Sequence, residues 1–360
     1  MSAREGVGLN SAFWRGKRVL VTGHTGFKGS WLTQWLKRAG SDVTGFALAP
    51  PTTPSLFDRA RVGDGIRSIE ADIRAFDALT RAFEEAKPEI VIHMAAQSLV
   101  RASYDDPVGT YATNVMGTVH LLDAVRRTGG VRVVIVVTSD KCYENREWLW
   151  PYRENEPMGG KDPYSSSKGC AELVTSAYRT SFFIGASSPR VASVRAGNVI
   201  GGGDWAKDRL VPDLVRAFQS GTPALIRNPG ATRPWQFVLD PLAGYLELAE
   251  ALWSDGKLAE GWNFGPHDAD VRSVRWIADR LTGAWGHGAA WRTVAGENPP
   301  EALTLKLDSS RARALLGWQP RVALESALGW IVEFQKELDA GGDAAALLDR
   351  QISRFEATRR

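Results

Sequence analysis

One stretch near the N-terminus decides the fold: residues 18–29 read Arg18-Val19-Leu20-Val21-Thr22-Gly23-His24-Thr25-Gly26-Phe27-Lys28-Gly29. It opens with an apolar run typical of a buried strand, and evenly spaced glycines follow, before a helix that we expect over residues 30–39. Glycines let an anion approach the backbone closely, and the free amides and positive dipole end of the helix then face its charge. The spacing predicts a turn that binds the pyrophosphate of a dinucleotide; the alternative is a tight turn with a structural role.

The same alternation of strands and helices continues through the first half of the chain. We expect strands over residues 42–48, 66–70, 90–93 and 131–137, and helices over residues 76–83 and 106–127. Residues 131–137 hold six valines or isoleucines in seven positions, which indicates a central strand buried on both faces. Asp106 is expected to cap the helix that follows it, with Pro107 at the first helical position. The alternation predicts an α/β fold built on a Rossmann-like, doubly wound parallel sheet.

The pattern loosens after about residue 195, where glycines and prolines separate shorter segments. Helical periodicity returns near residues 241–254, 272–283 and 323–338, which predicts a smaller mixed α/β lobe that binds the substrate. We therefore expect a flexible N-terminal arm over 1–16, the dinucleotide-binding Rossmann domain over 17–200, the substrate lobe over 201–340 with some chain crossing back, and a C-terminal tail over 341–360. The tail is expected to be either a peripheral helix or frayed.

Composition excludes several classes of protein. The 360 residues carry 44 Lys and Arg against 41 Asp and Glu, a net charge of +3, so we expect neither a nucleic acid nor a membrane as partner. Hydrophobic residues make up 44%, enough for a sizeable core, and no run approaches the roughly 18 apolar residues of a membrane span. Two cysteines cannot form a disulfide framework, and five histidines without ligand spacing predict no metal site. We expect a cytoplasmic protein.

Reactive side chains gather in the sequence after the strand at 131–137. That strand ends in Thr138-Ser139-Asp140-Lys141, at the edge where open α/β sheets bind ligands. Tyr164 and Lys168 stand four residues apart, on one face of a helix expected near residues 164–180. A phenol is a poor base because its ordinary pKa is about 10, but an adjacent ammonium group lowers that pKa. The pair predicts a tyrosine base, with an ordinary exposed helix face as the alternative.

Together these motifs resemble the extended short-chain dehydrogenase/reductase superfamily, over about residues 17–334. The shared features are the glycine turn, Ser139, and Tyr164 with Lys168. Residues 138–143 resemble the acid-bearing motif of nucleotide-sugar 4,6-dehydratases. Four segments resemble the CDP-glucose 4,6-dehydratase branch of that group, at residues 23–32, 140–145, 159–164 and 195–205. The resemblance covers both predicted lobes.

The resemblance implies that Ser139, Asp140, Lys141, Tyr164 and Lys168 are catalytic. Tyr164, aided by Lys168 and Ser139, would take the proton of a sugar 4-hydroxyl as hydride passes to bound NAD. The resulting ketone acidifies the hydrogen at carbon 5; loss of that hydrogen expels the 6-hydroxyl as water, and hydride returns to carbon 6. Asp140 would protonate the departing hydroxyl, which requires burial and a raised pKa. Lys141 would be either the base at carbon 5 or an ion-pair partner of Asp140 or Glu144 that orients the site.

The cofactor implied by the resemblance is NAD. Its expected contacts are Gly23, Thr25, Gly26, Phe27, Gly29, Asp72, Ile73, Ala95, Ala96, Gln97, Asn114, Tyr164 and Lys168. Asp72 would accept a hydrogen bond from the adenine amino group or, alternatively, cap the helix before Phe76. The acidic residue that usually follows the second strand of such a sheet is missing, so the residues alone leave NAD and NADP open.

The substrate implied by the resemblance is CDP-D-glucose, and the product is CDP-4-dehydro-6-deoxy-D-glucose. Its candidate contacts are Ser98, Arg101, Asn198, Arg209 and Arg233. Arg209 and Arg233 would pair with the diphosphate, since a guanidinium group binds phosphate oxygens in pairs; the alternative for each is a solvated surface position.

Three other functions remain open at this point: a nucleotide-sugar 4-epimerase or decarboxylase, a dehydratase of another nucleotide hexose, and a cofactor-binding regulator without catalysis. Asp140 with Lys141 favours a dehydratase, because an epimerase has no leaving group to protonate. The retained Tyr164 and Lys168 argue against a regulator. The helices near residues 107–127 and 164–180 resemble those that pair into a four-helix bundle in family dimers. We therefore expect a homodimer, with a tetramer as the alternative.

Overall fold

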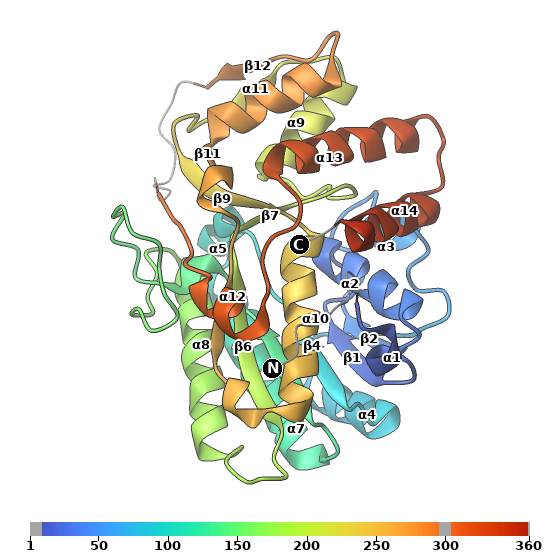
Figure 1. Ribbon diagram of the computed structural model, residues 1–360, viewed down its shortest axis with the longest axis vertical. Coiled ribbons are helices and arrows are strands. Elements are labelled where there is room, and N and C mark those ends of the chain that lie inside the picture. The colour runs from blue at the N-terminus through green and yellow to red at the C-terminus, as the bar shows by residue number, and fades with distance from the viewer. Residues whose placement is uncertain (1–8, 295–303, 359–360) are drawn as a thin grey trace.

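The large sheet of the protein consists of seven parallel strands in the order β10-β6-β5-β4-β1-β2-β3 (Figure 1). This computed structural model describes residues 9–294 and 304–358. The strands are β1 Arg18–Thr22, β2 Asp42–Ala47, β3 Arg67–Glu70, β4 Ile90–His93, β5 Val133–Val137, β6 Arg190–Ala196 and β10 Gly261–Phe264. The strand order reverses between β1 and β4, so the predicted doubly wound parallel sheet is confirmed.

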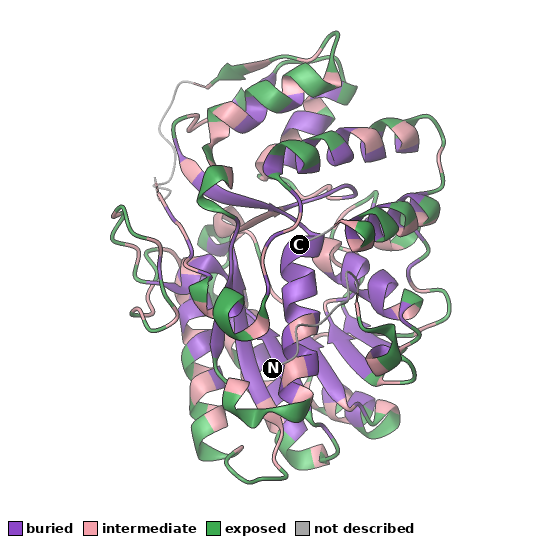
Figure 2. Ribbon diagram, viewed as in Figure 1, coloured by how far each residue is buried: buried purple, intermediate pink, exposed green. Residues whose placement is uncertain are grey.

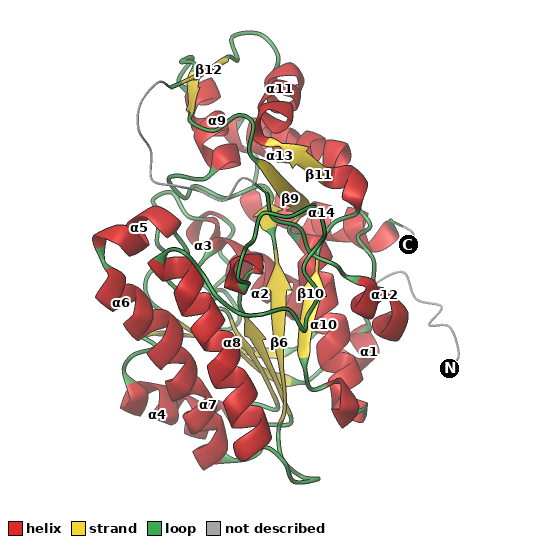
Figure 3. Ribbon diagram, turned by 90° about the vertical axis from the view of Figure 1, so that its left-hand side faces the viewer, coloured by secondary structure: helices red, strands yellow, loops and turns green. Residues whose placement is uncertain are grey.

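Helices cover both faces of this sheet, which Figure 3 shows as a middle layer between them. One face carries α4 Phe76–Ala86, α7 Gly117–Thr128 and α8 Pro163–Ser181; the other carries α2 Phe27–Arg38 and α10 Leu239–Ser254, with α14 Ala344–Ala357 packed on α2. Successive side chains of β5 enter opposite cores, with Ile135 on the α10 side and Val134 and Val136 on the α7 side. The strand is buried on both faces, as its valines predict (Figure 2).

The smaller lobe, at the top of Figure 1, has its own apolar core. A three-stranded sheet runs β11-β9-β7, with β7 Asn198–Ile200, β9 Thr232–Phe237 and β11 Val271–Ser273, and a pair joins β8 Ala224–Ile226 to β12 Trp291–Thr293. The lobe's helices are α9 Leu210–Gln219, α11 Val274–Trp285 and α13 Leu324–Asp339. The mixed α/β lobe predicted from sequence is confirmed. The chain returns to the large sheet at α10 and β10; the domain boundary at residue 200 stays a prediction.

The expectation of a flexible arm over residues 1–16 is wrong for the part that the structure describes. Residues Ser11–Trp14 form the short helix α1, and Trp14 is fully buried, with its indole nitrogen donating to Glu250 Oε1 at 2.8 Å. Residues 1–8 lie outside the described residues. At the other end α14 is a packed helix whose Ile352 and Phe355 are fully buried, so the peripheral-helix alternative holds for the tail. Burial of aromatic and aliphatic side chains therefore anchors α1 and α14.

The long helix predicted over residues 106–127 is divided by a π-helical turn. Asp106 caps α6 Pro107–Tyr111 by accepting from the amide of Gly109 at 2.8 Å, as predicted, and the π turn η1 Ala112–Met116 leads into α7. The helix expected from residue 30 begins earlier, at Phe27, because Gly26 already serves as its N-cap. The remaining short helices are α3 Leu56–Arg59, α5 Val100–Asp105, η2 Asp140–Cys142, η3 Gly256–Leu258, η4 Asp268–Asp270 and α12 Ser310–Leu316.

Candidate active site

The carboxyl end of β5 turns directly into a short 3-10 helix that carries the predicted acid. Ser139 is the N-cap of η2, and its hydroxyl accepts from the amide of Lys141 at 3.2 Å while donating to Asp140 Oδ1 at 3.0 Å. This places Ser139 and Asp140 at the edge of the sheet predicted to bind ligands. Both side chains are buried.

Asp140 is a buried carboxyl group with one oxygen unused. Burial raises the pKa of Asp140, against the opposing effects of Lys141, the hydrogen bond from Ser139, and Arg233. Oδ2 of Asp140 is buried and makes no hydrogen bond to any residue that the structure describes. A raised pKa favours the neutral acid, so Oδ2 can carry a proton toward a ligand.

Tyr164 and Lys168 lie on the first turns of α8 and face inward. Their exposed fractions are 8% and 6%, so the alternative of an ordinary exposed helix face is wrong. The Tyr164 hydroxyl is hydrogen-bonded to Ser139, which in turn contacts Asp140. Burial raises the pKa of Tyr164 to about 12. Ser139 and Arg209 oppose this rise in the pKa of Tyr164, and the lowering that we expected from Lys168 is not among the effects on Tyr164. The Lys168 ammonium donates to the main-chain oxygen of Val137, 3.4 Å away. Burial lowers the pKa of Lys168 to about 8.

A buried ion pair fixes α8 against the strand end that carries these groups. Glu172, one turn beyond Lys168, is bound by Arg195 of β6 through two nitrogen–oxygen contacts of 2.8 Å. Glu172 also accepts from the hydroxyls of Thr138 and Ser193. Burial opposes the charge of Glu172, yet Arg195 and these hydroxyls hold its pKa below the ordinary value. Sequence reasoning missed this pair; the only signal was the continued spacing of four residues from Tyr164 through Lys168 to Glu172.

The glycine turn fits a dinucleotide pyrophosphate. Gly23 has φ +75°, and a β-carbon there would come within 2.7 Å of the amide nitrogen of Ala95. A β-carbon on Gly29 would collide with the carbonyl oxygen of Gly23. Gly26 caps α2 without any side-chain hydrogen bond, so the first amides of the helix stay available to an anion. The backbone of the turn is therefore closely packed, and the first amide groups of α2 are free to donate hydrogen bonds to an anion. Pyrophosphate binding requires both features.

The segment after β4 runs beside this turn and is held by Asn114 of the π turn. The Asn114 amide donates to Gln97 O and to Ser167 Oγ at 2.9 and 2.8 Å, while its oxygen accepts from Gln97 N at 2.9 Å. Asn114 thus joins the predicted cofactor segment, Ala95, Ala96 and Gln97, to α8. π turns interrupt helices chiefly at functional sites. The side chain of Asn114 supports the site from within the protein.

The other predicted cofactor residues flank the ends of β1 to β3. The Thr25 hydroxyl donates to Leu48 O at 2.9 Å, and Phe27 begins α2. Asp72 does not cap α4, whose N-cap is Ala75; its carboxylate instead accepts from the amide and guanidinium of Arg74. The capping alternative for Asp72 is therefore wrong. Ile73, next to it, is buried.

Of the predicted substrate residues, Ser98 and Arg209 are in direct contact with each other. Arg209, just before α9, donates to Ser98 Oγ at 2.9 Å and pairs with Asp204 at 3.0 Å, and Arg101 pairs with Asp208 at 3.0 Å. Arg233 on β9 is buried and acts electrostatically on Asp140, so the surface alternative is wrong for this arginine. Asn198 begins β7 and is half-buried.

Two residues of this cluster were not assigned from the sequence. Lys28, inside the glycine turn motif, lies with its Nζ 3.5 Å from the hydroxyl of Tyr245 on α10. Both interact electrostatically with Asp140. The position of Lys28 in the first turn of a helix could have marked it in the sequence as a functional residue, because the positive end of a helix disfavours a cation. Tyr245 carries no local signal.

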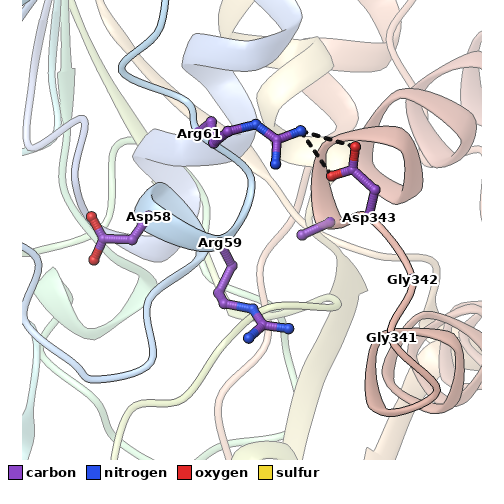
Figure 4. Close-up of a pocket in the computed structure, with 7 residues that line it drawn as sticks. Asp58, Arg59, Arg61, Gly341, Gly342 and Asp343 are labelled. Carbon is purple, nitrogen blue, oxygen red and sulfur yellow. Dashed lines mark hydrogen bonds and ion pairs between the residues drawn. The ribbon is translucent and has the colours of Figure 1, made fainter.

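Two surface hollows lie away from this cluster. The first, of about 550 Å³, is lined by Asp58, Arg59, Arg61, Gly341, Gly342, Asp343 and Ala344, with Arg61 paired to Asp343 (Figure 4). The second, of about 370 Å³, lies between α9 and α13 and includes Trp205. Neither contains a predicted site residue. Across residues 9–294 and 304–358 no group of three or more His, Cys, Asp or Glu side chains is arranged to hold a metal ion. Within the same ranges, none of the helices combines the length and apolarity needed to cross a membrane.

The chain is similar to known proteins along most of its length. The model of the NAD dependent epimerase/dehydratase family matches residues 19–259. CDP-glucose 4,6-dehydratase of Salmonella typhimurium is 54% identical over 352 residues, which cover 96% of this chain and 98% of that protein. UDP-glucose 4-epimerase of Mycolicibacterium smegmatis is 30% identical, over 88% of this chain and 98% of that protein. The resemblance predicted from the motifs is confirmed.

Solved structures share the fold. UDP-glucose 4-epimerase of Thermus thermophilus, in complex with NAD, matches with a TM-score of 0.75 and 26% identity, over 88% of this chain and 98% of that chain. The dTDP-glucose 4,6-dehydratase DesIV of Streptomyces venezuelae, with NAD bound, matches with a TM-score of 0.77 and 23% identity, over 91% and 99%. This second likeness concerns the fold alone.

Proposed function

Because this chain belongs to the NAD dependent epimerase/dehydratase family, we propose that it is a hydro-lyase that converts CDP-D-glucose to CDP-4-dehydro-6-deoxy-D-glucose. The 54% identity to a CDP-glucose 4,6-dehydratase over nearly the whole chain supports this substrate. Its cofactor is NAD, held at the glycine turn by the residues named above. The reaction oxidises carbon 4, eliminates water across carbons 5 and 6, and returns hydride to carbon 6.

One observation favours a dehydratase over a 4-epimerase on the same scaffold. Asp140 is buried, its pKa is raised, and its Oδ2 is unused, so it can present a proton beside the base Tyr164. An epimerase only moves hydride to and from carbon 4 and needs no acid for a leaving group. A buried carboxyl group with a raised pKa next to the tyrosine base therefore supports elimination.

Tyr164 serves as the base for the first step. Its ionised phenolate oxygen would take the proton of the sugar 4-hydroxyl, with Ser139 hydrogen-bonded to both Tyr164 and Asp140 and Lys168 held on the next turn of α8. NAD, when bound, supplies the hydride acceptor for carbon 4 and the hydride for carbon 6, and its positive ring favours the ionised phenol. The same hydrogen-bonded chain through Ser139 can pass the proton on to Asp140.

Elimination uses Asp140 as the acid and an amine as the base. Asp140 would protonate the 6-hydroxyl as the bond from carbon 6 to oxygen breaks, and the proton that Tyr164 collected restores Asp140 afterward. The hydrogen at carbon 5 is acidified by the adjacent ketone, so a neutral amine suffices as its acceptor. Besides Lys168, which assists Tyr164, the cluster offers two amines, Lys141 in η2 and Lys28 in α2. Among the described residues Lys141 forms no ion pair with Asp140 or Glu144, although its charge acts on Asp140.

The nucleotide part of the substrate would span the facing edges of the two lobes. Arg209 and Arg233 would bind the diphosphate, and Ser98, Arg101 and Asn198 would line the sugar and its phosphates. Arg209 and Arg101 are paired with Asp204 and Asp208, and phosphate oxygens would compete for the same guanidinium groups.

A homodimer belongs to the same proposal, with a tetramer as the alternative. Large apolar side chains stand exposed on the adjoining helices α6, η1 and α8: Val108, Tyr111, Met116 and Leu173. Contiguous helices that carry such side chains are typical of an interface, here a four-helix bundle formed with a second copy. We also propose a cytoplasmic location, in keeping with the free thiols of Cys142 and Cys170.

The test is to incubate the protein with NAD and CDP-, dTDP- or GDP-linked hexoses and to measure the ultraviolet absorbance of a 4-keto-6-deoxy sugar in alkali. We expect product from CDP-glucose and its loss in Tyr164→Phe, which should still bind NAD. Formation of a 4-epimer instead, or no product from CDP-glucose, would overturn the proposal. Faster turnover of another nucleotide hexose would overturn the choice of substrate.

A further inference from the structure

We infer that Lys28 is the base that removes the hydrogen from carbon 5 of the bound hexose. The inference rests on the proposed dehydration and assigns a residue to its least defined step. It follows from where α2 places this side chain and from the groups that surround it.

Lys28 reaches the reactive cluster from a different element than Asp140. It is the second residue of α2, directly after the glycine turn, and its stem is partly buried. Its Nζ lies 3.5 Å from the Tyr245 hydroxyl and 5.5 Å from the centre of the Tyr245 ring. Tyr245 is fully buried on α10, so its contact holds the amine in place. Asp140, by contrast, comes from η2 after β5.

Four charged or titratable groups face Lys28, and they come from four elements. Lys168 of α8 and Arg209 before α9 repel its positive charge, Asp140 of η2 attracts it, and Tyr245 of α10 touches it. Burial raises the pKa of the Tyr245 hydroxyl, so Tyr245 stays neutral and adds no charge. No residue that the structure describes forms an ion pair with Lys28. Among these four groups, two are cations that repel the amine, and Asp140 is the one carboxyl group that attracts it.

These surroundings favour the neutral amine. Burial is the largest effect, followed by repulsion from Lys168 and Arg209, and together they lower the pKa of Lys28 to about 7. The positive end of the α2 dipole acts in the same direction. At pH 7 about half of the molecules would carry an unprotonated Nζ. An amine in this state is a competent general base at neutral pH.

The step balances with the groups named. The proton at carbon 5 goes to the neutral Nζ of Lys28, and the electron pair of that bond forms the double bond between carbons 5 and 6. The bond from carbon 6 to oxygen breaks with its electron pair on oxygen, which takes the proton of Asp140 and leaves as water. As hydride returns to carbon 6, the Lys28 ammonium gives its proton back to carbon 5. Lys28 ends neutral, as it began.

The experiment compares Lys28→Ala with Lys141→Ala and with Lys37→Ala, a control on the same helix whose Nζ donates to Val62 O. The NAD-loaded proteins receive CDP-glucose in deuterium oxide; reduced cofactor is followed by absorbance, and deuterium at carbon 5 by NMR. For Lys28→Ala we expect reduced cofactor to accumulate and elimination to slow at least about 100-fold. Ethylamine added to this variant should restore part of the rate, which a structural role would not allow. Lys37→Ala should match the unsubstituted protein.

The pH dependence supplies a second readout. In the unsubstituted protein the rate of exchange at carbon 5 should rise as pH increases through about 7, because the neutral form of Lys28 appears there. In the substrate-free protein, labelling of Lys28 by acetic anhydride, located by mass spectrometry, should rise over the same range. That measurement needs neither a variant nor turnover.

Three outcomes would overturn the inference. Stalled elimination in Lys141→Ala with normal exchange in Lys28→Ala would make Lys141 the base. A weaker NAD affinity in Lys28→Ala without slower elimination would make Lys28 a cofactor anchor. Labelling that rises only far above pH 7 would remove the neutral amine. If the unsubstituted protein forms neither reduced cofactor nor keto sugar from CDP-glucose, the proposed function fails first, and this inference with it.

Discussion

Asp140 shows how one residue acquires its role from its surroundings. A carboxyl group in water is ionised at neutral pH, and Ser139, Lys141 and Arg233 all favour the ionised form of Asp140. Burial outweighs these effects and raises its pKa. The raised pKa of Asp140 is therefore a property of the site rather than of aspartate itself.

At this scale we predict that Asp140→Asn separates oxidation from elimination. Asparagine keeps the shape and the contact with Ser139 but has no proton acidic enough to release the 6-hydroxyl, so reduced cofactor should form and elimination should fall at least about 100-fold. Rapid mixing with CDP-glucose, read by absorbance of the reduced cofactor and of the keto sugar, checks this. An equal loss of both steps would contradict the role of Asp140 as the acid.

At the scale of elements, α8 is the part of the molecule that assembles the site. Tyr164, Lys168 and Glu172 recur at four-residue spacing, so all three lie on the buried face of one helix. Arg195 of β6 binds Glu172 and thereby fixes the rotation of α8 about its axis. Because Thr138 also contacts Glu172, the same pair anchors the start of the turn that carries Ser139 and Asp140.

We predict that Glu172→Gln lowers the free energy of unfolding by about 3–5 kcal/mol, since it leaves Arg195 charged and buried without its partner. Urea unfolding followed by circular dichroism measures this. Glu325→Gln is the matched control, because Glu325 forms an exposed pair with Arg280 and its loss should change stability by less than about 1 kcal/mol. A similarly small change in the free energy of unfolding of both variants would show that the buried pair does not fix α8 in position.

At the scale of the whole molecule, the site lies between two lobes that contact each other through charged side chains. Arg209 reaches Ser98, and Arg101 reaches Asp208, so the segment after β4 is tied to the segment before α9. A nucleotide sugar bound between these segments would touch both lobes at once. The helices α6 and α8 lie on the face of the large sheet opposite α10, at the outside of the molecule (Figure 3).

We predict that this outward face forms the dimer. Leu173→Arg places a charge on an α8 position that is 60% exposed and should convert a dimer to monomers, as measured by light scattering with size-exclusion chromatography. Leu315→Arg on α12, where the leucine is 52% exposed, is the matched control and should leave the dimer intact. Monomers in the unsubstituted protein, or dissociation by the control alone, would contradict the assignment.

The order of the elements and the residue types of the site follow from local patterns in the sequence. The apolar run Val19 to Thr22, the glycines after it and the following helical pattern specify a strand, a turn and a helix. The four-residue spacing of Tyr164 and Lys168 likewise predicts a shared helix face without reference to the rest of the chain. Such patterns can be recognised without knowing the tertiary structure, because they depend only on residues close together in the sequence. The packed helix at Trp14 was missed, because a short aromatic segment has no periodicity and gains its stability only from the distant Glu250 and the core.

The tertiary structure alone decided which charges face one another. Lys28 and Tyr245 are 217 residues apart, and Glu172 and Arg195 lie on different elements, so no spacing along the chain brings either pair together. Electrostatic interactions and desolvation depend on distance in space and on exclusion of water, neither of which a linear pattern records. The sequence therefore identifies the acid and the tyrosine, while the raised pKa of Asp140 and the lowered pKa of Lys28 arise only when α2, α8, α10 and η2 converge.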